Sequence, residues 1–360
     1  MRAADFRFPF GRLRASQRLS LSNVLSLSKR QISDFRFAAL AVLVAFSACG
    51  RKPPADRGQT WTPDATVPAT PEMRETAAPP PAEIWKFFSG ERAFADVRKQ
   101  VEFGPRPSGS AEIEPARAHI VSSLEAAGWS VERQEFTDTT PRGPMKFVNL
   151  IARFAAPGAK PTPTTQRAIV CSHYDTKRFS TIQFVGASDG ASSTGALLEL
   201  ARVLALDPAL AAKVELVFFD GEEALQQFNE TDGLYGSRYY AAKLRESGRA
   251  KQFQFGILWD MIGDRDLTIT LSADTPGELT KAVLASAEAL GVRDRFSYHD
   301  RPIYDDHVPL NMARIPTIDL IDFDYLPWHT ADDTLDKLSP ASLQTIGALT
   351  LFHLRKALAK

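Results

Sequence analysis

Cysteine is almost absent from this chain of 360 residues, which contains only Cys49 and Cys171. Two cysteines cannot form a disulfide framework, so the cellular compartment has to be inferred from the N-terminal segment instead. An excess of charge is also missing, because 43 basic residues balance 43 acidic ones. Nucleic-acid-binding proteins usually carry a basic excess, and we therefore expect no nucleic-acid partner. The length suffices for one large globular domain with additional segments.

A long hydrophobic run is missing as well. Basic residues between positions 29 and 36 precede the apolar run 37–46, which is too short for a permanent transmembrane helix but fits the core of a signal peptide. Small residues directly before Cys49 resemble a bacterial lipoprotein cleavage site, and a short buried helix is the alternative interpretation. We expect residues 1–48 to be a lipoprotein-type signal peptide. Cys49 would then carry a lipid that anchors the protein to a membrane. We therefore expect an exported protein of the bacterial periplasm or cell envelope.

The segment 49–82 is rich in proline and contains almost no large aliphatic residues. Such a composition cannot bury enough apolar surface to fold, and it is typical of a semi-extended linker. We therefore expect one folded domain, residues 83–360, held away from the membrane surface by this linker.

Strand-like and helix-like patterns alternate along that domain. Apolar and β-branched runs predict strands at 129–137, 147–154, 167–172, 214–219, 254–260, 267–272 and 315–321. Amphipathic spacing predicts helices at about 112–127, 190–206, 233–246, 276–290 and 340–358. This alternation predicts an α/β fold, a three-layer sandwich in which helices flank a mixed, mainly parallel central sheet. The first two strands follow each other closely, so we expect them to pair antiparallel at one edge.

The most informative stretch is the strand 214–219 together with the four residues directly after it. The apolar run ends at Asp220-Gly221, and two adjacent carboxylates, Glu222 and Glu223, come next. The carboxyl end of a buried parallel strand is where open α/β sheets place their active sites. Two glutamates are costly to hold together there unless a cation or a shared proton relieves their repulsion. This motif favours a metal site, with one glutamate as ligand and its neighbour as acid/base; a solvated loop is the alternative.

Further histidine and acidic residues follow other apolar runs in the same way. They are His173, Asp175, Asp260, Asp319 and His329. Asp189 precedes the predicted helix 190–206. Zinc accepts imidazole nitrogen and carboxylate oxygen, and catalytic zinc sites keep one position open for water or substrate. Ligands dispersed over the ends of several strands are typical of a site at the edge of a sheet.

Six short motifs occur together and in order. They are His173-Tyr174-Asp175, Gly186-Ala187-Ser188-Asp189, Phe218-Phe219-Asp220-Gly221-Glu222-Glu223-Ala224, Leu234-Tyr235-Gly236-Ser237-Arg238, Asp305-Asp306-His307-Val308-Pro309 and Trp328-His329-Thr330. With these motifs the chain resembles the zinc-dependent aminopeptidase superfamily, and within it the animal-type glutaminyl-peptide cyclotransferases (glutaminyl cyclases). The resemblance covers nearly all of residues 88–358.

The resemblance implies a role for each matched residue. It makes Asp189, Glu223 and His329 the ligands of one zinc ion. It makes Glu222 the general acid/base, supported by the carboxylates of Asp260 and Asp305.

The resemblance also implies a substrate pocket and a reaction. Trp328 would line the pocket, together with Phe228, which stands where the animal enzymes carry a tryptophan. The substrate would be a peptide or protein with N-terminal glutamine, whose α-amine attacks its own γ-carbonyl. Pyroglutamate forms and ammonia leaves, with Glu222 moving the proton between the two nitrogens.

Two further departures from the animal pattern are visible. Asp319 replaces a histidine in the strand before the Trp-His pair. Cys171 lacks the second cysteine with which the animal enzymes form a disulfide, so we expect a buried free thiol. We also expect Trp259 to belong to the core, and His307 to cap or orient its loop rather than to bind metal.

A two-zinc aminopeptidase is the alternative enzyme. His173 and Asp260 match the positions that bind a second metal in that branch, where Asp189 would bridge the two ions. Glu222 would then activate a metal-bound water that cleaves the N-terminal peptide bond. A third interpretation is a non-catalytic, lipid-anchored binding module, although no ligand position is missing from the sequence.

Overall fold

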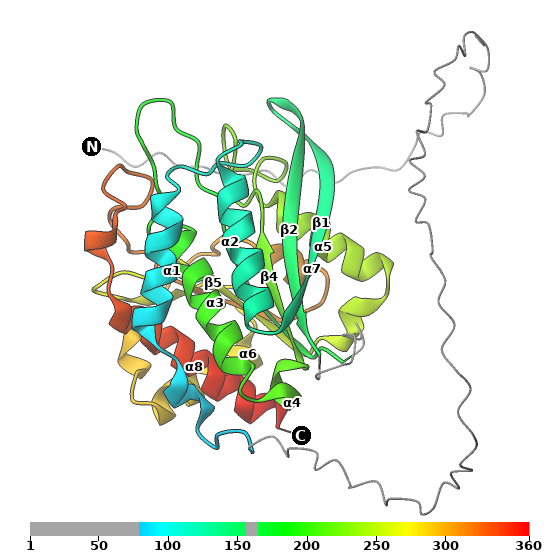
Figure 1. Ribbon diagram of the computed structural model, residues 1–360, viewed down its shortest axis with the longest axis vertical. Coiled ribbons are helices and arrows are strands. Elements are labelled where there is room, and N and C mark those ends of the chain that lie inside the picture. The colour runs from blue at the N-terminus through cyan, green and yellow to red at the C-terminus, as the bar shows by residue number, and fades with distance from the viewer. Residues whose placement is uncertain (1–78, 156–164, 360) are drawn as a thin grey trace, which may run out of the picture. The chain divides into compact units, whose positions relative to one another are not determined.

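The computed structural model describes residues 79–155 and 165–359 (Figure 1). The expected signal peptide, 1–48, and nearly all of the expected linker, 49–82, lie outside these residues and stay predictions. Among the described residues, no helix combines the length and the apolar composition that crossing a bilayer requires.

The domain contains eight strands and eight α-helices within the described residues. The strands are β1 (Trp129–Thr140), β2 (Gly143–Phe154), β3 (Ala168–His173), β4 (Val214–Phe219), β5 (Phe255–Asp260), β6 (Ile269–Leu271), β7 (Phe296–Tyr298) and β8 (Thr317–Ile321). The helices are α1 (Gly90–Glu102), α2 (Ile113–Ala126), α3 (Ala191–Leu204), α4 (Pro208–Ala211), α5 (Tyr235–Glu246), α6 (Gly277–Ala289), α7 (His307–Met312) and α8 (Pro340–Leu358). Four short 3-10 helices accompany them: η1 (Ile84–Phe87), η2 (Arg249–Gln252), η3 (Arg293–Arg295) and η4 (Leu335–Lys337).

All eight strands form one mixed sheet, in the order β1-β2-β4-β3-β5-β8-β6-β7. The four central strands, β4, β3, β5 and β8, are parallel. β1 and β2 pair antiparallel at one edge, as their short connection predicts. The connection after β3 leads to β4 on one side, whereas the chain after β5 continues to β6 and β8 on the other. The carboxyl ends of β3 and β5 therefore form a topological switch point, where open α/β sheets bind their ligands.

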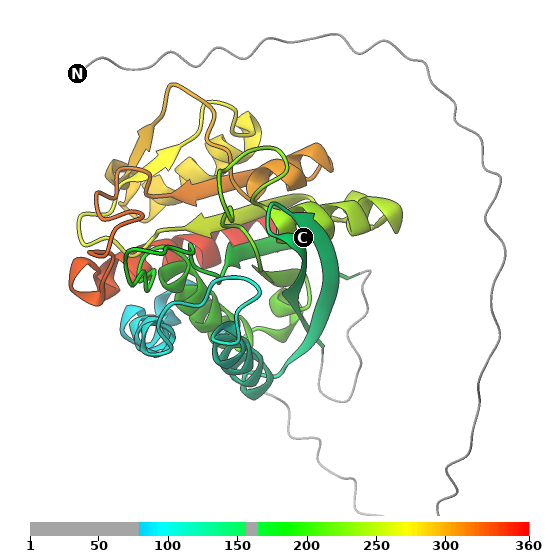
Figure 2. The same ribbon diagram turned by 90° about the horizontal axis from the view of Figure 1, so that it is seen from above.

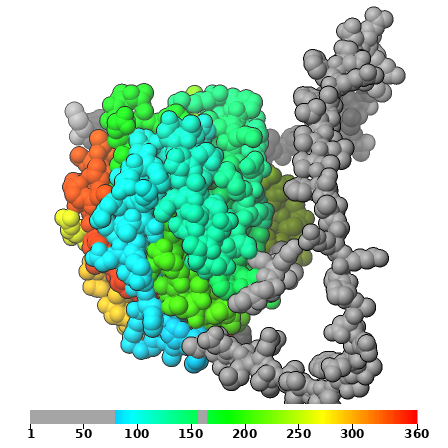
Figure 3. All heavy atoms as spheres, viewed as in Figure 1, coloured from blue at the N-terminus to red at the C-terminus, as the bar shows by residue number. Residues whose placement is uncertain are grey.

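Helices cover both faces of the sheet (Figure 2). The side chains of the central strand β3 alternate between two apolar clusters, because successive residues of a strand point to opposite faces. In β3, Val170 belongs to the cluster beneath α1, α2, α3, α6 and α8, whereas Ile169 and Cys171 belong to the cluster beneath α5 and α7. The space-filling view shows α1, α2 and the β1–β2 hairpin forming the face seen in Figure 1 (Figure 3). The predicted three-layer α/β sandwich is confirmed.

The structure also decides several smaller expectations. Trp259 is fully buried and donates a hydrogen bond to Thr350 Oγ1 over 3.2 Å, so its core position is confirmed. Cys171 is a buried free thiol, as expected. The short elements α4, α7 and β7 were not predicted, because segments of three to six residues show no clear periodicity.

Close packing of α1 against α3 generates one prediction. A Cβ atom on Gly195 would lie 2.7 Å from Val97 Cγ2 and 2.9 Å from the Ala93 carbonyl oxygen. Gly195→Ala should therefore destabilise the domain by about 1–3 kcal/mol, because overpacking outweighs the gain in helix propensity. Urea unfolding measures this difference. Gly277→Ala, at the open start of α6, is the matched control and should be neutral or slightly stabilising. A Gly195→Ala protein as stable as the parent would contradict the close α1–α3 contact.

Candidate metal centre

The residues that the motifs single out meet at the switch point of the sheet. His173 is the last residue of β3 and Asp260 the last residue of β5. Glu222 and Glu223 follow the end of β4, and Asp189 lies just before α3. Parallel strands that end at the same edge bring these side chains together from distant parts of the sequence.

The three expected zinc ligands form one group. Asp189, Glu223 and His329 each offer a ligand atom, and these atoms all lie within 4.8 Å of one another. His329 Nε2 is 3.2 Å from Glu223 Oε1 and 3.4 Å from Asp189 Oδ2. The two carboxylates are buried, whereas the histidine is partly exposed at the mouth of the site. The structure thus brings together all three residues that the sequence suggested.

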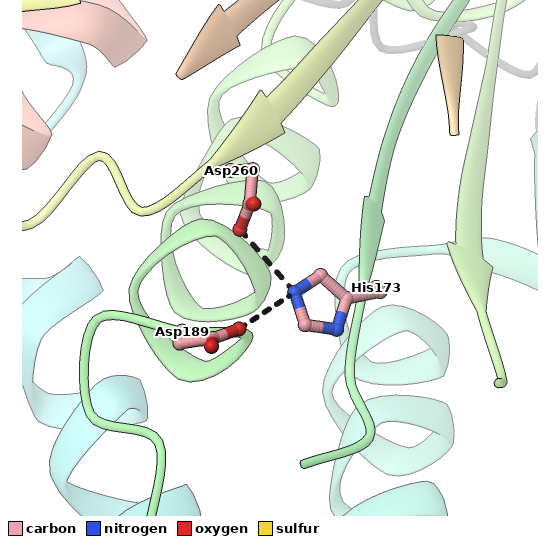
Figure 4. A group of neighbouring side chains, drawn as sticks. All are labelled: His173, Asp189 and Asp260. Carbon is pink, nitrogen blue, oxygen red and sulfur yellow. Dashed lines mark hydrogen bonds and ion pairs between the residues drawn. The ribbon is translucent and has the colours of Figure 1, made fainter. Parts of the chain in front are cut away.

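A second group shares Asp189 with the first. His173 Nε2 lies 3.2 Å from Asp189 Oδ1 and 3.2 Å from Asp260 Oδ1 (Figure 4). The two oxygens of Asp189 therefore face different histidines, Oδ1 toward His173 and Oδ2 toward His329. A carboxylate in this position can bridge two cations or serve one of them.

The chemistry of these atoms fits a divalent cation such as zinc. Imidazole nitrogens and carboxylate oxygens are zinc ligands, and within the described residues Asp189 Oδ2 accepts no hydrogen bond despite being buried. Burial lowers the pKa of His329, but its contacts with Asp189 and Glu223 outweigh that effect and raise the pKa to about 10. Burial raises the pKa of Asp189, but the two histidines outweigh it and lower the pKa. A cation held by Asp189, Glu223 and His329 would take the place of the proton on the histidine and neutralise the carboxylates in its stead.

Glu222 stands beside this group without belonging to it. Its carboxylate lines the cavity and accepts no hydrogen bond that the described residues provide, whereas its backbone is fixed. The Glu222 amide donates to Asp175 Oδ1 over 3.2 Å, and its carbonyl accepts from the Leu234 amide over 2.8 Å. Burial, and next the charge of Glu223, raise the pKa of Glu222 well above its ordinary value. This combination of a held backbone, a free carboxylate and a raised pKa suits a group that takes and returns a proton.

The cavity in front of Glu222 has a volume of about 360 Å³ and an aromatic wall. Phe228, Tyr304, Phe323 and Trp328 contribute to this wall. Trp328 is 43 % exposed, and its ring stacks on that of His329 with centroids 4.3 Å apart. Both residues expected at the substrate pocket, Trp328 and Phe228, therefore lie at the cavity surface.

A buried acidic region continues behind the cavity. Asp305 lines the cavity, whereas Asp319 lies deeper, with its Oδ2 3.5 Å from His307 Nδ1. The pKa of Asp305 is raised well above its ordinary value, first by burial and next by the charge of Asp260. The pKa of Asp319 is raised in the same way, first by burial and next by the charge of Asp305. Burial lowers the pKa of His307 to about 4, which keeps its ring neutral. The position where the animal enzymes carry a histidine is thus occupied by a carboxyl group that favours its neutral form.

Loop residues that the motifs did not single out hold Asp189 in place. The Asp333 carboxylate accepts hydrogen bonds from the amides of Ser188 and Asp189, over 2.7 and 3.1 Å. The buried guanidinium of Arg106 donates to the carbonyls of Tyr174 and Gly186, over 2.8 and 3.2 Å. Arg106 thereby ties the segment after β3 to the loop that carries Asp189. In the sequence, Arg106 is notable only for lying between two prolines. That pattern indicates a turn and gives no sign that the side chain connects two loops.

Two features of the backbone accompany these contacts. Gly190 has φ +87°, and a Cβ there would lie 2.8 Å from the Asp175 carbonyl oxygen, so only glycine fits beside Asp189. His329 and Met261 have positive φ, at 57° and 47°, although both carry side chains. Such strain persists only where surrounding contacts enforce it, and it is typical of functional sites.

Lys177 is a cation at the cavity surface that the sequence patterns did not indicate. Its Nζ lies 3.3 Å from Glu223 Oε2, whereas His329 lies against the other oxygen, Oε1. Each oxygen of Glu223 thus has a positively polarised neighbour. The lysine belongs to the irregular segment after β3, where periodicity gives no information on the direction of a side chain.

Comparison with known proteins agrees with this geometry. Residues 149–353 match the model of Peptidase family M28. A glutaminyl-peptide cyclotransferase of Drosophila melanogaster is 30 % identical over 283 residues, which are 71 % of this chain and 78 % of that protein. The counterpart from Boiga irregularis is also 30 % identical, over 69 % of this chain and 76 % of its own length.

Solved structures give the same result. The crystal structure of a glutaminyl cyclase from an Acidobacteriales bacterium is 35 % identical, with a TM-score of 0.68 over 75 % of this chain and 94 % of that one. A leucine aminopeptidase precursor from Bacteroides thetaiotaomicron is 27 % identical, with a TM-score of 0.65 over 74 % of this chain and 97 % of that one. From these matches and the site they surround, we conclude that the chain belongs to peptidase family M28 and, within it, to the glutaminyl cyclases.

Proposed function

We propose that this protein is a zinc-dependent glutaminyl-peptide cyclotransferase that converts N-terminal glutamine of peptides or proteins to pyroglutamate and releases ammonia. The observation that carries the proposal is the position of Glu222, a carboxylate with a raised pKa that faces an aromatic cavity beside a complete ligand group. The family relationship supports the same reaction.

The proposed chemistry needs little from the protein beyond placement and one proton carrier. Asp189, Glu223 and His329 would hold the zinc, which when bound acts as a Lewis acid toward the γ-carbonyl oxygen of the substrate. The cavity wall orients the glutamine so that its neutral α-amine faces its own γ-carbon. Because the nucleophile belongs to the substrate, no activated water or enzyme nucleophile is required.

Glu222 completes the cycle through proton transfer. As the α-amine attacks, a nitrogen–carbon bond closes the five-membered ring, and the Glu222 carboxylate accepts the proton that the amine loses. The same proton then passes to the γ-amide nitrogen, the bond between this nitrogen and the γ-carbon breaks, and ammonia leaves. Asp260 and Asp305 are the buried carboxyl groups that we expect to support Glu222, since Asp305 lies at the cavity and Asp260 at the adjoining strand end.

A specific observation favours a second candidate function, hydrolysis of N-terminal residues by an aminopeptidase with two metals. His173, Asp189 and Asp260 form a second ligand group that meets the same distance limit as the first. If both groups held zinc, Glu222 would serve as the base for a water molecule instead of the substrate amine. The number of metal ions per chain and the product released separate these two functions.

Location is a separate proposal, which rests on the sequence alone. We propose that residues 1–48 are a signal peptide and that Cys49 is lipidated, so that the enzyme acts on exported peptides or proteins at the bacterial cell envelope. The Pro-rich segment 49–82 would serve as the tether.

Removal of the Glu222 carboxylate should slow turnover strongly without loss of metal. Glu222→Gln should lower kcat for ammonia release by about 10²–10⁴-fold, because general acid–base catalysis contributes that much. Since Glu222 lies outside the ligand group, zinc content should not change. Glu222 must be ionised to accept a proton, and its pKa is raised well above the ordinary value of 4.5. As the pH is lowered, kcat/KM of the parent should therefore begin to fall at a pH well above 4.5. Retention of activity within a few fold would contradict the role, and Glu125→Gln, exposed at the end of α2, is the matched control.

Metal content provides the second test. Mass spectrometry of the purified protein should find one zinc per chain, and a Gln-initiated peptide should release ammonia but no free amino acid. Dialysis against a chelator should abolish ammonia release, and added zinc should restore it. Two metals per chain together with a liberated N-terminal residue would instead establish the aminopeptidase.

The anchor can be tested in cells. Cys49→Ser should shift the protein from the membrane fraction to the soluble fraction, because the thiol is the attachment point of the proposed lipid. Fractionation followed by immunoblotting measures this shift, and Cys171→Ser is the matched control. An unchanged membrane fraction for Cys49→Ser would exclude lipidation at this residue.

A further inference from the structure

A second groove adjoins the active-site cavity on the face covered by α5 and α7. These two helices pack against each other, and the groove between them has a volume of about 500 Å³. Its walls include Arg238, Ala241 and Arg245 of α5, together with Pro309 and Met312 of α7. The chemistry described above uses none of these residues.

Tyr304 joins the groove to the active site. Its side chain lines both the cavity in front of Glu222 and the groove between α5 and α7. The ring of Phe228 meets that of Tyr304 edge to face, with centroids 5.8 Å apart, so the two rings form a shared rim. A molecule that extends out of the cavity over this rim enters the groove directly.

The groove has the surface that an extended peptide requires. The small side chains of Ala241 and Ala242 leave room on α5, and Met312 and Tyr304 expose apolar surface, at 71 % and 44 %. An extended chain rises about 3.3 Å per residue, so a peptide whose first residue occupies the cavity continues outward and brings its later residues toward the groove. A small metabolite would not need this continuation.

The charges in the groove favour an acidic segment. Arg238 is already engaged, since it donates to the carbonyls of Glu230 and Leu234 over 2.9 and 3.3 Å. Arg245 is exposed at the end of α5, and the described residues offer its guanidinium no hydrogen bond or ion pair. Arg238 also lies 3.8 Å from Asp138 Oδ2, which leaves Arg245 as the cation of the groove that no carboxylate of the described residues pairs with.

We propose that the groove between α5 and α7 binds the segment of the peptide substrate that follows the N-terminal glutamine, and that Arg245 selects an acidic side chain in this segment. The proposal rests on the proposed cyclase function and adds the class of substrate. Continuity through Tyr304 and the complementary charge of Arg245 identify a substrate peptide as the occupant. Arg245 contacts the substrate far from the reacting atoms, so it sets specificity through binding.

The experiment compares a short substrate with two series of longer ones. Glutamine amide fills only the cavity, whereas peptides Gln-Ala₅ with a single Glu or a single Lys at positions three to six also enter the groove. Ammonia release gives kcat/KM for each peptide at low ionic strength. For each protein variant, kcat/KM of the Glu peptide is divided by kcat/KM of the Lys peptide with the substitution at the same position. A general change in the activity of the variant cancels in this ratio.

The parent protein should prefer the Glu peptide by about two- to fivefold at one or two positions, mainly through KM, as an exposed ion pair allows. Arg245→Ala should bring the ratio to about one and Arg245→Glu should invert it, while about 0.5 M salt should weaken the preference of the parent. Arg295→Glu, an equal change of charge at an exposed position before the edge strand β7, should leave the ratio unchanged.

The possible failures are distinguishable. No ammonia from glutamine amide or from any peptide would overturn the cyclase function itself. Cyclisation of all substrates with a Glu-to-Lys ratio of one at every position would overturn the groove proposal alone. An equal shift of the ratio in Arg295→Glu would assign the preference to net charge rather than to the groove, and would also overturn it. Thermal unfolding of each variant verifies that it is folded. If Arg245→Glu does not fold, Arg245→Ala alone is sufficient to test the proposal.

Discussion

Repulsion between buried carboxylates is the constraint on which the rest of this structure depends. Asp189, Glu222, Glu223, Asp260 and Asp305 gather at one edge of the sheet, where burial disfavours their charged forms and their proximity disfavours them further. Such a cluster is tolerable only if cations or protons neutralise it. Both kinds of neutralisation have a place at the sheet edge, since a cation suits the ligand atoms and a proton suits the glutamate that faces the cavity. The proposed metal binding and the proposed proton transfer would thus both relieve the same carboxylate repulsion.

The surrounding loops explain how such a costly arrangement persists. Backbone amides, which cannot lose their polarity, help to hold the acidic residues: the amide of Asp189 donates to Asp333, and the amide of Glu222 donates to Asp175. Arg106 adds a buried cation that connects two of these loops through their carbonyls. The positive φ of His329 indicates that the position of this candidate ligand costs the domain part of its stability. A rigid parallel sheet beneath the loops makes this possible, since its strand ends cannot move independently.

Two candidate ligand groups share Asp189, and the solved structures similar to this chain include both a glutaminyl cyclase and a leucine aminopeptidase precursor. In either proposed reaction an N-terminal residue would enter the cavity, and Glu222 would accept a proton from the attacking group. The two reactions differ in the source of the nucleophile, the substrate amine in one case and water in the other. In our proposal, specificity for the rest of the peptide is a separate matter that depends on the groove beyond Tyr304.

The class of fold and the ends of the central strands could be predicted from the sequence alone, because apolar runs that stop at polar residues are patterns of neighbouring residues. The candidate ligand group of Asp189, Glu223 and His329 was identified from motifs, and the parallel strands that end at one edge help to bring its atoms together. Tertiary structure alone decided the positions of Arg106 and Lys177 and the path of the groove. These depend on the direction in which a side chain leaves an irregular loop, and on which distant segment it meets there, and neither is encoded in the spacing of neighbouring residues.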